Sequence, residues 1–210
     1  MKYLEESFKS QYGQDKELLK LIGEKQNGFF VELGASDGIF LSNSYFFEKE
    51  LGWTGLLIEP DPIAFKNLKE NRKNSFVSNA LIGSKSGEEK LFLLAGVVSG
   101  IIKEHPSYWI KKNLNNDKIL LKTQLLSDIL DEFNCPKQID FLSLDVEGFE
   151  YDILNTFPFY KYTFDYICVE HNACYDSSIN KKKITDLLIK NNYILIKELS
   201  IDDIFMYNKN

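Results

Sequence analysis

The chain has 210 residues, of which 44% are hydrophobic and 27% charged, a composition typical of globular proteins and not of disordered, fibrous or membrane proteins. This length is enough for one substantial core, so we expect a single domain over residues 1–210. The formal net charge of −6 argues against a nucleic-acid partner, because binding to a phosphate backbone needs clustered Lys and Arg.

The first 14 residues alternate charged and polar side chains with isolated aromatics, and they lack the apolar core of a secretory signal. No apolar run reaches the roughly 18 residues that a membrane helix needs. We therefore expect a cytoplasmic protein without a membrane partner, and the oligomeric state stays open.

Apolar runs bounded by turn residues alternate with helical stretches along the chain. The expected strands are 28–33, 54–59, 76–80, 139–145 and 165–170, and a final antiparallel pair is expected at 193–197 and 204–207. Helices are expected at about 41–51, 60–72 and 182–190. This alternation predicts an α/β fold in which a mostly parallel, twisted sheet carries helices on both faces.

The pattern breaks down between Leu94 and Thr123, where Gly, Ser, His-Pro and Asn-Asn replace it. The stretch is longer than a typical connection in a compact domain, so we expect a variable insertion on the substrate side at about 95–124. Tyr108 and Trp109 would stack on a sugar face or anchor the loop on the core. His105 is a further candidate for a substrate contact.

Ligands of open parallel α/β sheets bind at the carboxyl ends of the strands, where the connecting loops diverge and leave a crevice. We therefore expect the ligand site among the polar residues and glycines at those ends. They are Glu32, Gly34, Asp37, Gly38, Glu59, Asn79, Asp145, Glu147, Glu170 and His171.

The turn after the first expected strand reads Gly-Ala-Ser-Asp-Gly instead of the dinucleotide fingerprint G-x-G-x-x-G. Asp37 within this turn is unfavourable beside a pyrophosphate, but it suits a ligand that carries an amino group and a sulfonium. Glu59, at the end of the next strand, is placed to accept two hydrogen bonds from a ribose diol. A helix cap ahead of Pro60 is the alternative role for Glu59, and an ordinary turn residue is the alternative for Asn79.

The fourth strand ends in Leu144-Asp145-Val146-Glu147-Gly148, which places two carboxylates in one turn. Two acids so close together are costly to bury without a cation or hydrogen-bond donors, although they would also serve as caps of the helix that follows. His171 follows the fifth strand and is the side chain best matched to accepting a proton near neutrality, with a purely structural role as the alternative.

Several motifs occur together and in order. They are Gly13-Gln14-Asp15, Gly28-Phe-Phe-Val-Glu-Leu-Gly34, Ser42-Asn43-Ser44, Gly52-Trp53-x-Gly55-Leu-Leu-Ile-Glu59-Pro60, Ile139-Asp-Phe-Leu-Ser-Leu-Asp-Val-Glu-Gly148 and Glu170-His171-Asn172. In these motifs the chain resembles the FkbM family of methyltransferases over most of its length. Two departures are Glu32, where the family often carries Asp, and Ser36, where Asn is common.

The resemblance implies a class I, Rossmann-like methyltransferase fold with S-adenosylmethionine as methyl donor. It also implies O-methylation of a small-molecule or glycan acceptor, usually at a sugar or secondary-metabolite hydroxyl. The positions that match the family's cofactor motifs are Glu32, Gly34, Asp37, Gly38, Asn43, Glu59, Asn79 and Asp145. At the methyl-transfer face the resemblance places Asp145, Glu147, Glu170 and His171; we expect His171 or Asp145 to be the base and Glu147 to orient it or the substrate.

Three alternatives stay open. We expect no metal, but Asp145, Glu147 and Glu170 would be the ligands of a divalent ion such as Mg²⁺ if one were used. A nicotinamide-dependent oxidoreductase is disfavoured by the missing G-x-G-x-x-G. A non-catalytic binding module is disfavoured because acidic and histidine residues stand at the strand ends.

Overall fold

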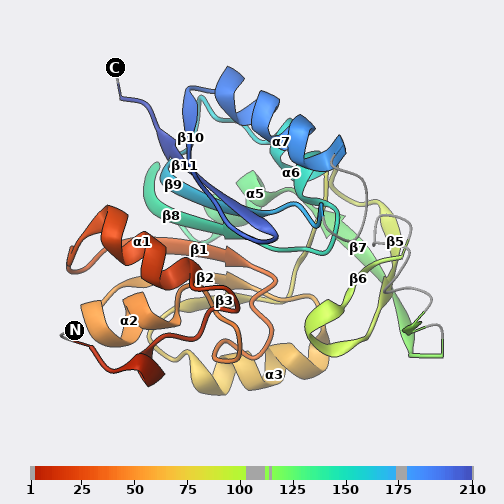
Figure 1. The fold of residues 1–210 in the computed structure, drawn as a ribbon. Helices are drawn as coiled ribbons and strands as arrows, with labels where there is room; N and C mark the ends of the chain where they lie inside the picture. Colours follow the sequence, from red (N-terminus) through yellow and green to blue (C-terminus); the bar gives the residue numbers. More distant parts are fainter. Residues whose placement is uncertain (1–2, 103–111, 114, 174–178, 210) are drawn as a thin grey trace.

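The computed structural model describes residues 3–102, 112–113, 115–173 and 179–209 (Figure 1). A seven-stranded sheet has the order β10-β11-β9-β8-β1-β2-β3, and every neighbouring pair is parallel except the two that β11 makes. The predicted α/β fold with a C-terminal antiparallel pair is therefore confirmed. The strands are β1 (Phe29–Leu33), β2 (Thr54–Ile58), β3 (Phe76–Ser78), β8 (Gln138–Leu144), β9 (Thr163–Glu170), β10 (Tyr193–Glu198) and β11 (Asp202–Tyr207).

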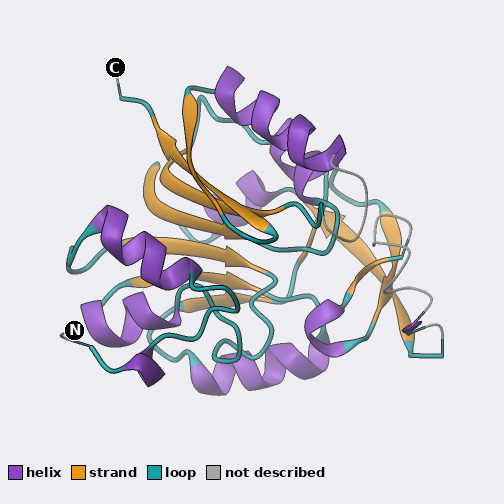
Figure 2. Cartoon of the chain, in the orientation of Figure 1, coloured by secondary structure: helices purple, strands orange, loops and turns teal. Residues whose placement is uncertain are grey.

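Helices cover both faces of this sheet (Figure 2). Adjacent strand residues point to opposite faces, so Phe30 packs in one hydrophobic cluster and Val31 in the other. The Phe30 cluster receives α1 (Gln14–Ile22), α2 (Tyr45–Leu51) and α3 (Pro62–Asn71). The Val31 cluster receives α5 (Leu126–Glu132), α6 (Glu150–Thr156) and α7 (Ile179–Lys190).

Local signals explain where the helices beside the site begin and end. The Asp61 carboxylate accepts hydrogen bonds from the backbone N–H groups of Ile63 and Ala64, and Pro62 occupies the first turn of α3. Helix α2 ends at Gly52, which adopts the left-handed conformation with a φ of 66°. Helices α1 and α5 were not predicted.

A second sheet corrects the prediction that residues 95–124 are irregular. Its order is β4-β7-β5-β6, formed by β4 (Leu81–Ile82), β5 (Glu89–Leu93), β6 (Gly100–Ile101) and β7 (Lys118–Gln124). Short 3-10 helices, η1 (Glu5–Ser7) and η2 (Gly96–Val98), complete the described elements. Strand β7 is buried only at Thr123, so its hydrophobic pattern is weak. His105, Tyr108 and Trp109 lie outside the described residues.

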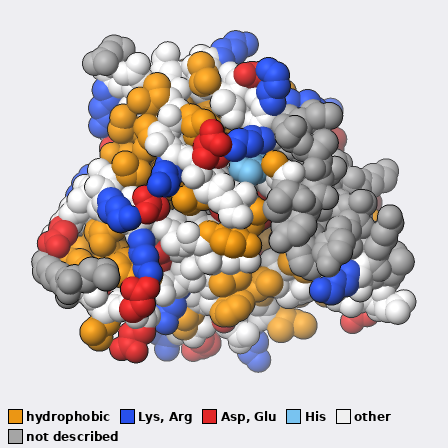
Figure 3. All heavy atoms as spheres, viewed as in Figure 1, with side chains coloured by type: hydrophobic (Ala, Val, Ile, Leu, Met, Phe, Trp, Pro, Cys, Tyr) orange, Lys and Arg blue, Asp and Glu red, His pale blue; other side chains and the backbone are white. Residues whose placement is uncertain are grey.

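None of the helices in the described part of the chain is long and apolar enough to span a bilayer. On the face shown in Figure 3, basic and acidic side chains are interspersed, so this face carries no extended patch of one sign.

Candidate active site

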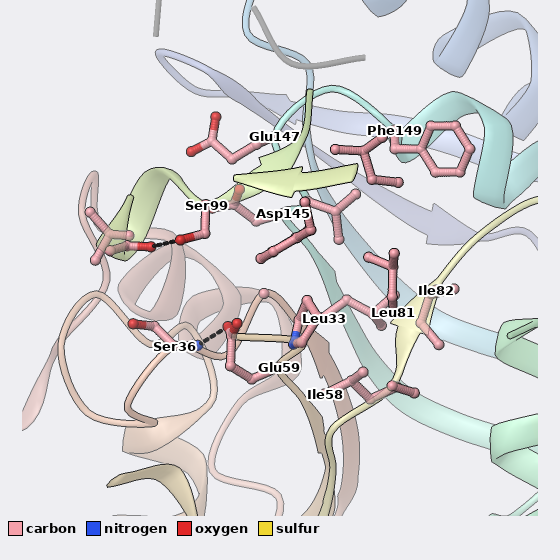
Figure 4. Close-up of a pocket in the computed structure, with 18 residues that line it drawn as sticks. Leu33, Ser36, Ile58, Glu59, Leu81, Ile82, Ser99, Asp145, Glu147 and Phe149 are labelled. Atoms are coloured by element: carbon pink, nitrogen blue, oxygen red, sulfur yellow. Dashed lines mark hydrogen bonds between the residues drawn. The ribbon is translucent and has the colours of Figure 1, made fainter. Parts of the chain in front are cut away.

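Two adjoining hollows lie at the carboxyl ends of the central strands. The β2 hollow is lined by the ends of β1 and β2 together with residues of the second sheet (Figure 4). The β9 hollow extends from β1 past β8 to Glu170 and Asn172 at and after the end of β9. The two hollows form one crevice because they share lining residues, namely Leu33, Gly34, Ser36, Val97, Asp145 and Glu147.

Gly34 lies at the centre of this crevice and has a φ of 75°. A Cβ atom at this position would lie 1.8 Å from the backbone oxygen of Asp145. Only glycine therefore lets the first turn pass so close to the end of β8. This close approach of two backbone segments explains the glycine, and the contact of Gly34 with a ligand stays a prediction.

Glu59 is the acid of the β2 hollow. Its Oε2 accepts a hydrogen bond from the Ser36 N–H at 2.8 Å, and its Oε1 accepts one from the Asp61 N–H, also at 2.8 Å. Burial raises the pKa of this carboxyl to about 7, although the two backbone donors oppose that shift. The second sheet adds an apolar wall through Leu81 and Ile82. A buried carboxylate beside an apolar wall can receive a hydroxylated, aromatic ligand.

Glu32 is buried and fully engaged with the loop that follows the first turn. Its carboxylate accepts hydrogen bonds from Ser42 Oγ, from Asn43 N–H and from Ser44 Oγ. The buried Arg72 donates to both serine hydroxyls from the other side. Glu32 therefore shapes the wall of the β9 hollow that carries Asn43.

The floor of the β9 hollow is acidic. Asp145, Glu147 and Glu170 all line it. Burial and neighbouring acids raise the pKa of Asp145 to about 8 and that of Glu147 to about 9, and they also raise the pKa of Glu170. Glu147 has a φ of 59°, and within the described residues its buried Oε2 has no hydrogen-bond partner. Backbone strain together with an unpaired buried oxygen is typical of a functional position.

Glu150 lies beside this floor, in the first turn of α6. Its Oε1 accepts hydrogen bonds from the backbone N–H groups of Val146 and Gly148, both at 3.0 Å, and so holds the turn that carries Glu147. One oxygen each of Asp145, Glu150 and Glu170 lie within 4.8 Å of one another. The sequence had proposed Glu147 as the third member of such a group, and the structure brings Glu150 there instead.

His171 lines neither hollow among the described residues, which differs from the role predicted for it. Its Nδ1 accepts a hydrogen bond from the Ala173 N–H at 3.1 Å, and its Nε2 lies 3.6 Å from Asp203 Oδ1. Nδ1 is thus engaged as an acceptor, and Nε2 is buried without a hydrogen bond among the described residues. A ring that lines neither hollow does not suit a general base.

Asp37, Gly38 and Asn79 also line neither hollow within the described residues. Asp37 Oδ1 accepts hydrogen bonds from the next turn, and Asn79 Nδ2 donates to the Glu59 backbone oxygen. A Cβ atom at Gly38 would meet side-chain atoms of Leu68 and Arg72 at 2.6 Å. These residues were predicted to contact the cofactor, whereas their recorded contacts shape and pack the loops around the site.

Sequence reasoning missed several lining residues. Gln14 lines the β9 hollow, and its Nε2 donates to Asp202 Oδ2 at 2.7 Å. Gln14 belongs to the motif Gly13-Gln14-Asp15, but the sequence analysis assigned it no role. Val97 and Ser99 come from the segment expected to be irregular, and the two-residue strand β4 is too short to leave a pattern. Glu150 resembles an ordinary acid in the first turn of a helix.

Residues 32–195 match the family model described as a methyltransferase FkbM domain. No curated protein matches the chain. The structure of precorrin-6y C5,15-methyltransferase from Geobacter metallireducens aligns with a TM-score of 0.51 and 9% identity, over 93% of this chain and 87% of that one. The structure of Aeropyrum pernix fibrillarin with bound S-adenosyl-L-methionine aligns with a TM-score of 0.50 and 12% identity, over 91% of this chain and 72% of that one. At such identities these likenesses show the fold, which is that of class I methyltransferases.

Proposed function

The chain belongs to the FkbM family of methyltransferases, and on this premise we propose that it transfers the methyl group of S-adenosylmethionine to a hydroxyl oxygen of a sugar or glycan. The observation that carries the proposal is the crevice itself, in which Glu59 and the acids of the β9 hollow face the same open space around Gly34. When bound, S-adenosylmethionine supplies an electrophilic methyl group on a positively charged sulfur.

The residues of the β2 hollow fit an adenosine. Each oxygen of Glu59 has accepted only one backbone hydrogen bond, so each retains a lone pair for a ribose hydroxyl. Leu81, Ile82 and Ile58 offer an apolar surface for the adenine ring. Gly34 would let the backbone approach the amino-acid part of the cofactor.

The acids of the β9 hollow fit the charged part of the cofactor and the reacting hydroxyl. Asp145 and Glu147 line both hollows, so they lie where the sulfonium and the acceptor would meet. We assign the role of base to Glu147, because its Oε2 has no partner among the described residues and His171 lines neither hollow. The raised pKa of Glu147 makes its ionised form a strong base, and the positive sulfonium beside it would favour that form. Glu147 Oε2 takes the proton of the hydroxyl as the new oxygen–carbon bond forms, and the electrons of the breaking carbon–sulfur bond stay on sulfur.

Most of the rate then comes from positioning, which contributes on the order of 7–11 kcal/mol when reactants are well oriented. A base adds roughly 10² to 10⁴-fold. Asp145 is placed to orient the acceptor beside Glu147.

Two features of the β9 hollow support a sugar as acceptor. Its wall carries the amide side chains of Gln11, Gln14, Asn43 and Asn172, which suit the alternating donors and acceptors of a polyol. Phe40 also lines this hollow and is 59% exposed, so its ring is available to stack on the apolar face of a sugar.

Thermal shift with S-adenosylhomocysteine and, separately, NAD tests the cofactor. Stabilisation by S-adenosylhomocysteine of about 2.7 kcal/mol at a hundredfold excess over Kd is expected, with no effect of NAD. The reverse result would identify an oxidoreductase.

Incubation with S-adenosylmethionine and a panel of glycosides and aminoglycosides, followed by NMR of the product, tests the acceptor. Methylation of nitrogen alone would contradict O-methyl transfer, and binding without turnover on any acceptor would favour a binding module.

A further inference from the structure

Three carboxylates from three different elements converge beside the β9 hollow. Asp145 follows β8, Glu150 opens α6 and Glu170 ends β9, and one oxygen of each lies within 4.8 Å of the others. Glu150 and Glu170 are buried and Asp145 is partly buried. Three like charges in so small and dry a volume repel one another strongly unless something positive lies between them.

No described side chain supplies that positive charge. The ion pairs of Lys and Arg within the described ranges go to other acids, and the buried Arg72 pairs with Glu48 and, at 4.0 Å, with Glu32. The donors to the three acids are uncharged: Glu150 receives backbone N–H groups, Glu170 Oε2 receives Asn172 Nδ2 at 2.5 Å, and Asp145 and Glu170 share a hydrogen bond. The group is therefore short of positive charge.

A second, independent observation concerns two oxygens that line the same hollow. Asn43 is 6% exposed and Glu147 is 8% exposed, and Asn43 Oδ1 and Glu147 Oε2 have no hydrogen-bond partner among the described residues. The amide nitrogen of Asn43 donates to Ser143 Oγ at 2.9 Å, which leaves its oxygen as the free end. Buried, unpartnered oxygens are rare and call for a ligand that accepts electron pairs or donates hydrogen bonds.

We propose that Asp145, Glu150 and Glu170 bind one hard divalent cation, Mg²⁺ or Mn²⁺, at the floor of the β9 hollow. An all-oxygen set of carboxylates is the donor set that these ions prefer, and waters or the acceptor would fill the remaining positions. Asn43 Oδ1 and Glu147 Oε2 are placed in the same hollow to accept hydrogen bonds from water held by the ion.

The use of this cation in catalysis rests on the proposed function. A hydroxyl bound to the ion becomes more acidic, which would help Glu147 remove its proton. The ion would also hold the acceptor at one end of the crevice while Glu59 holds the cofactor at the other. The site differs from the metal set expected from sequence, because Glu150 takes the place of Glu147.

Isothermal titration of the chelator-treated full chain with MgCl₂ and, separately, MnCl₂ tests the site. Ionic strength is matched with KCl, and no cofactor is present. One saturable site per chain is expected. Glu150→Gln keeps an oxygen for the Val146 and Gly148 N–H groups, so it removes a ligand charge with little change in shape; both it and Glu170→Gln should weaken binding by at least about tenfold. Glu132→Gln, at an exposed position in α5, is the matched control and should bind as the wild type does.

Absence of saturable binding of both ions, or binding that neither variant weakens, would overturn the proposal and leave protons as the neutralising charge. If the variants do not fold, Mn²⁺ added to the wild type should broaden NMR signals of residues 143–150 and 170–172 first. Broadening that starts elsewhere would also overturn it. Glu59→Gln should keep the ion and bind S-adenosylhomocysteine more weakly, so failure of the metal site and failure of the methyltransferase proposal give different results.

Discussion

The two hollows of the crevice solve the burial of acids in opposite ways. Glu59 lines only the β2 hollow, and each of its oxygens receives one backbone N–H. Asp145 and Glu147 line both hollows, Glu32 and Glu170 line the β9 hollow, and Glu147 Oε2 has no partner among the described residues. Glu59 therefore has the donors that a buried carboxylate needs and can also accept hydrogen bonds from a neutral diol. The acids of the β9 hollow need a positively charged or hydrogen-bond-donating ligand to offset the cost of their burial. We therefore expect substitutions at Glu59 to affect cofactor binding and substitutions at Glu147 to affect the rate of methyl transfer.

The largest effect is expected for Glu147→Gln, which tests the difference between the two hollows. The amide keeps the size of the side chain but cannot take a proton, so kcat should fall by roughly 10² to 10⁴-fold. The Kd for S-adenosylhomocysteine, measured by calorimetry, should change little because Glu59 and the apolar wall of Leu81 and Ile82 are untouched. The exposed Glu132→Gln again serves as control. A variant that loses cofactor binding instead would show that Glu147 belongs to the cofactor site.

Glu59→Gln should produce the reverse pattern. Loss of charge-assisted hydrogen bonds of about 1.5–3 kcal/mol should weaken S-adenosylhomocysteine binding by roughly 10 to 100-fold. The rate at saturating cofactor should stay close to that of the wild type. If kcat falls while Kd is unchanged, the assignment of the β2 hollow to adenosine is wrong.

The same residue predicts a pH dependence. The pKa of Glu59 in the folded protein is raised from 4.5 to about 7, so the folded state holds this proton more tightly than the unfolded state. Its contribution to the free energy of unfolding is therefore greatest at low pH and is lost as the pH rises from 4.5 through 7. Cofactor affinity should run the other way and improve as the pH rises through 7, because the carboxylate is the better acceptor. Titrations at several pH values check this, and in Glu59→Gln that pH dependence should disappear.

The smallest effect on chemistry is expected for His171→Gln. His171 lines neither hollow in the described part of the chain, so kcat should fall by far less than the roughly 100-fold that loss of a base causes. Thermal unfolding should report the loss of the contact with Asp203. A fall as large as that of Glu147→Gln would return the role of base to the histidine.

The strands that position the site were predictable from local patterns. The runs that became β1, β2, β8 and β9 are apolar and end in turn residues, and burial on both faces explains why. Strands β4 to β7 were not predictable in the same way. Most residues of β7 are exposed or partly exposed, and β4 has two residues, so neither carries a clear hydrophobic period.

The sequence predicted where the crevice lies better than it predicted which side chains line it. The need for glycine at position 34 and the acid at position 59 follow from the chain's path at the ends of two adjacent strands. The direction of a loop side chain depends on neighbours distant in sequence. Asp203 of β11 and the Ala173 N–H contact the His171 ring, which lines neither hollow. Leu68 of α3 and Arg72, which follows that helix, pack where Gly38 was expected to face a ligand.

Sequence alone therefore determined the strands of the main sheet, the helices α2, α3 and α7 and the family, because hydrophobic period and turn residues are local properties. Only the tertiary structure decided which acids meet. Asp145, Glu150 and Glu170 converge because the parallel strands β8 and β9 end side by side and the first turn of α6 lies close to those ends. No local pattern of the sequence encodes such a long-range contact.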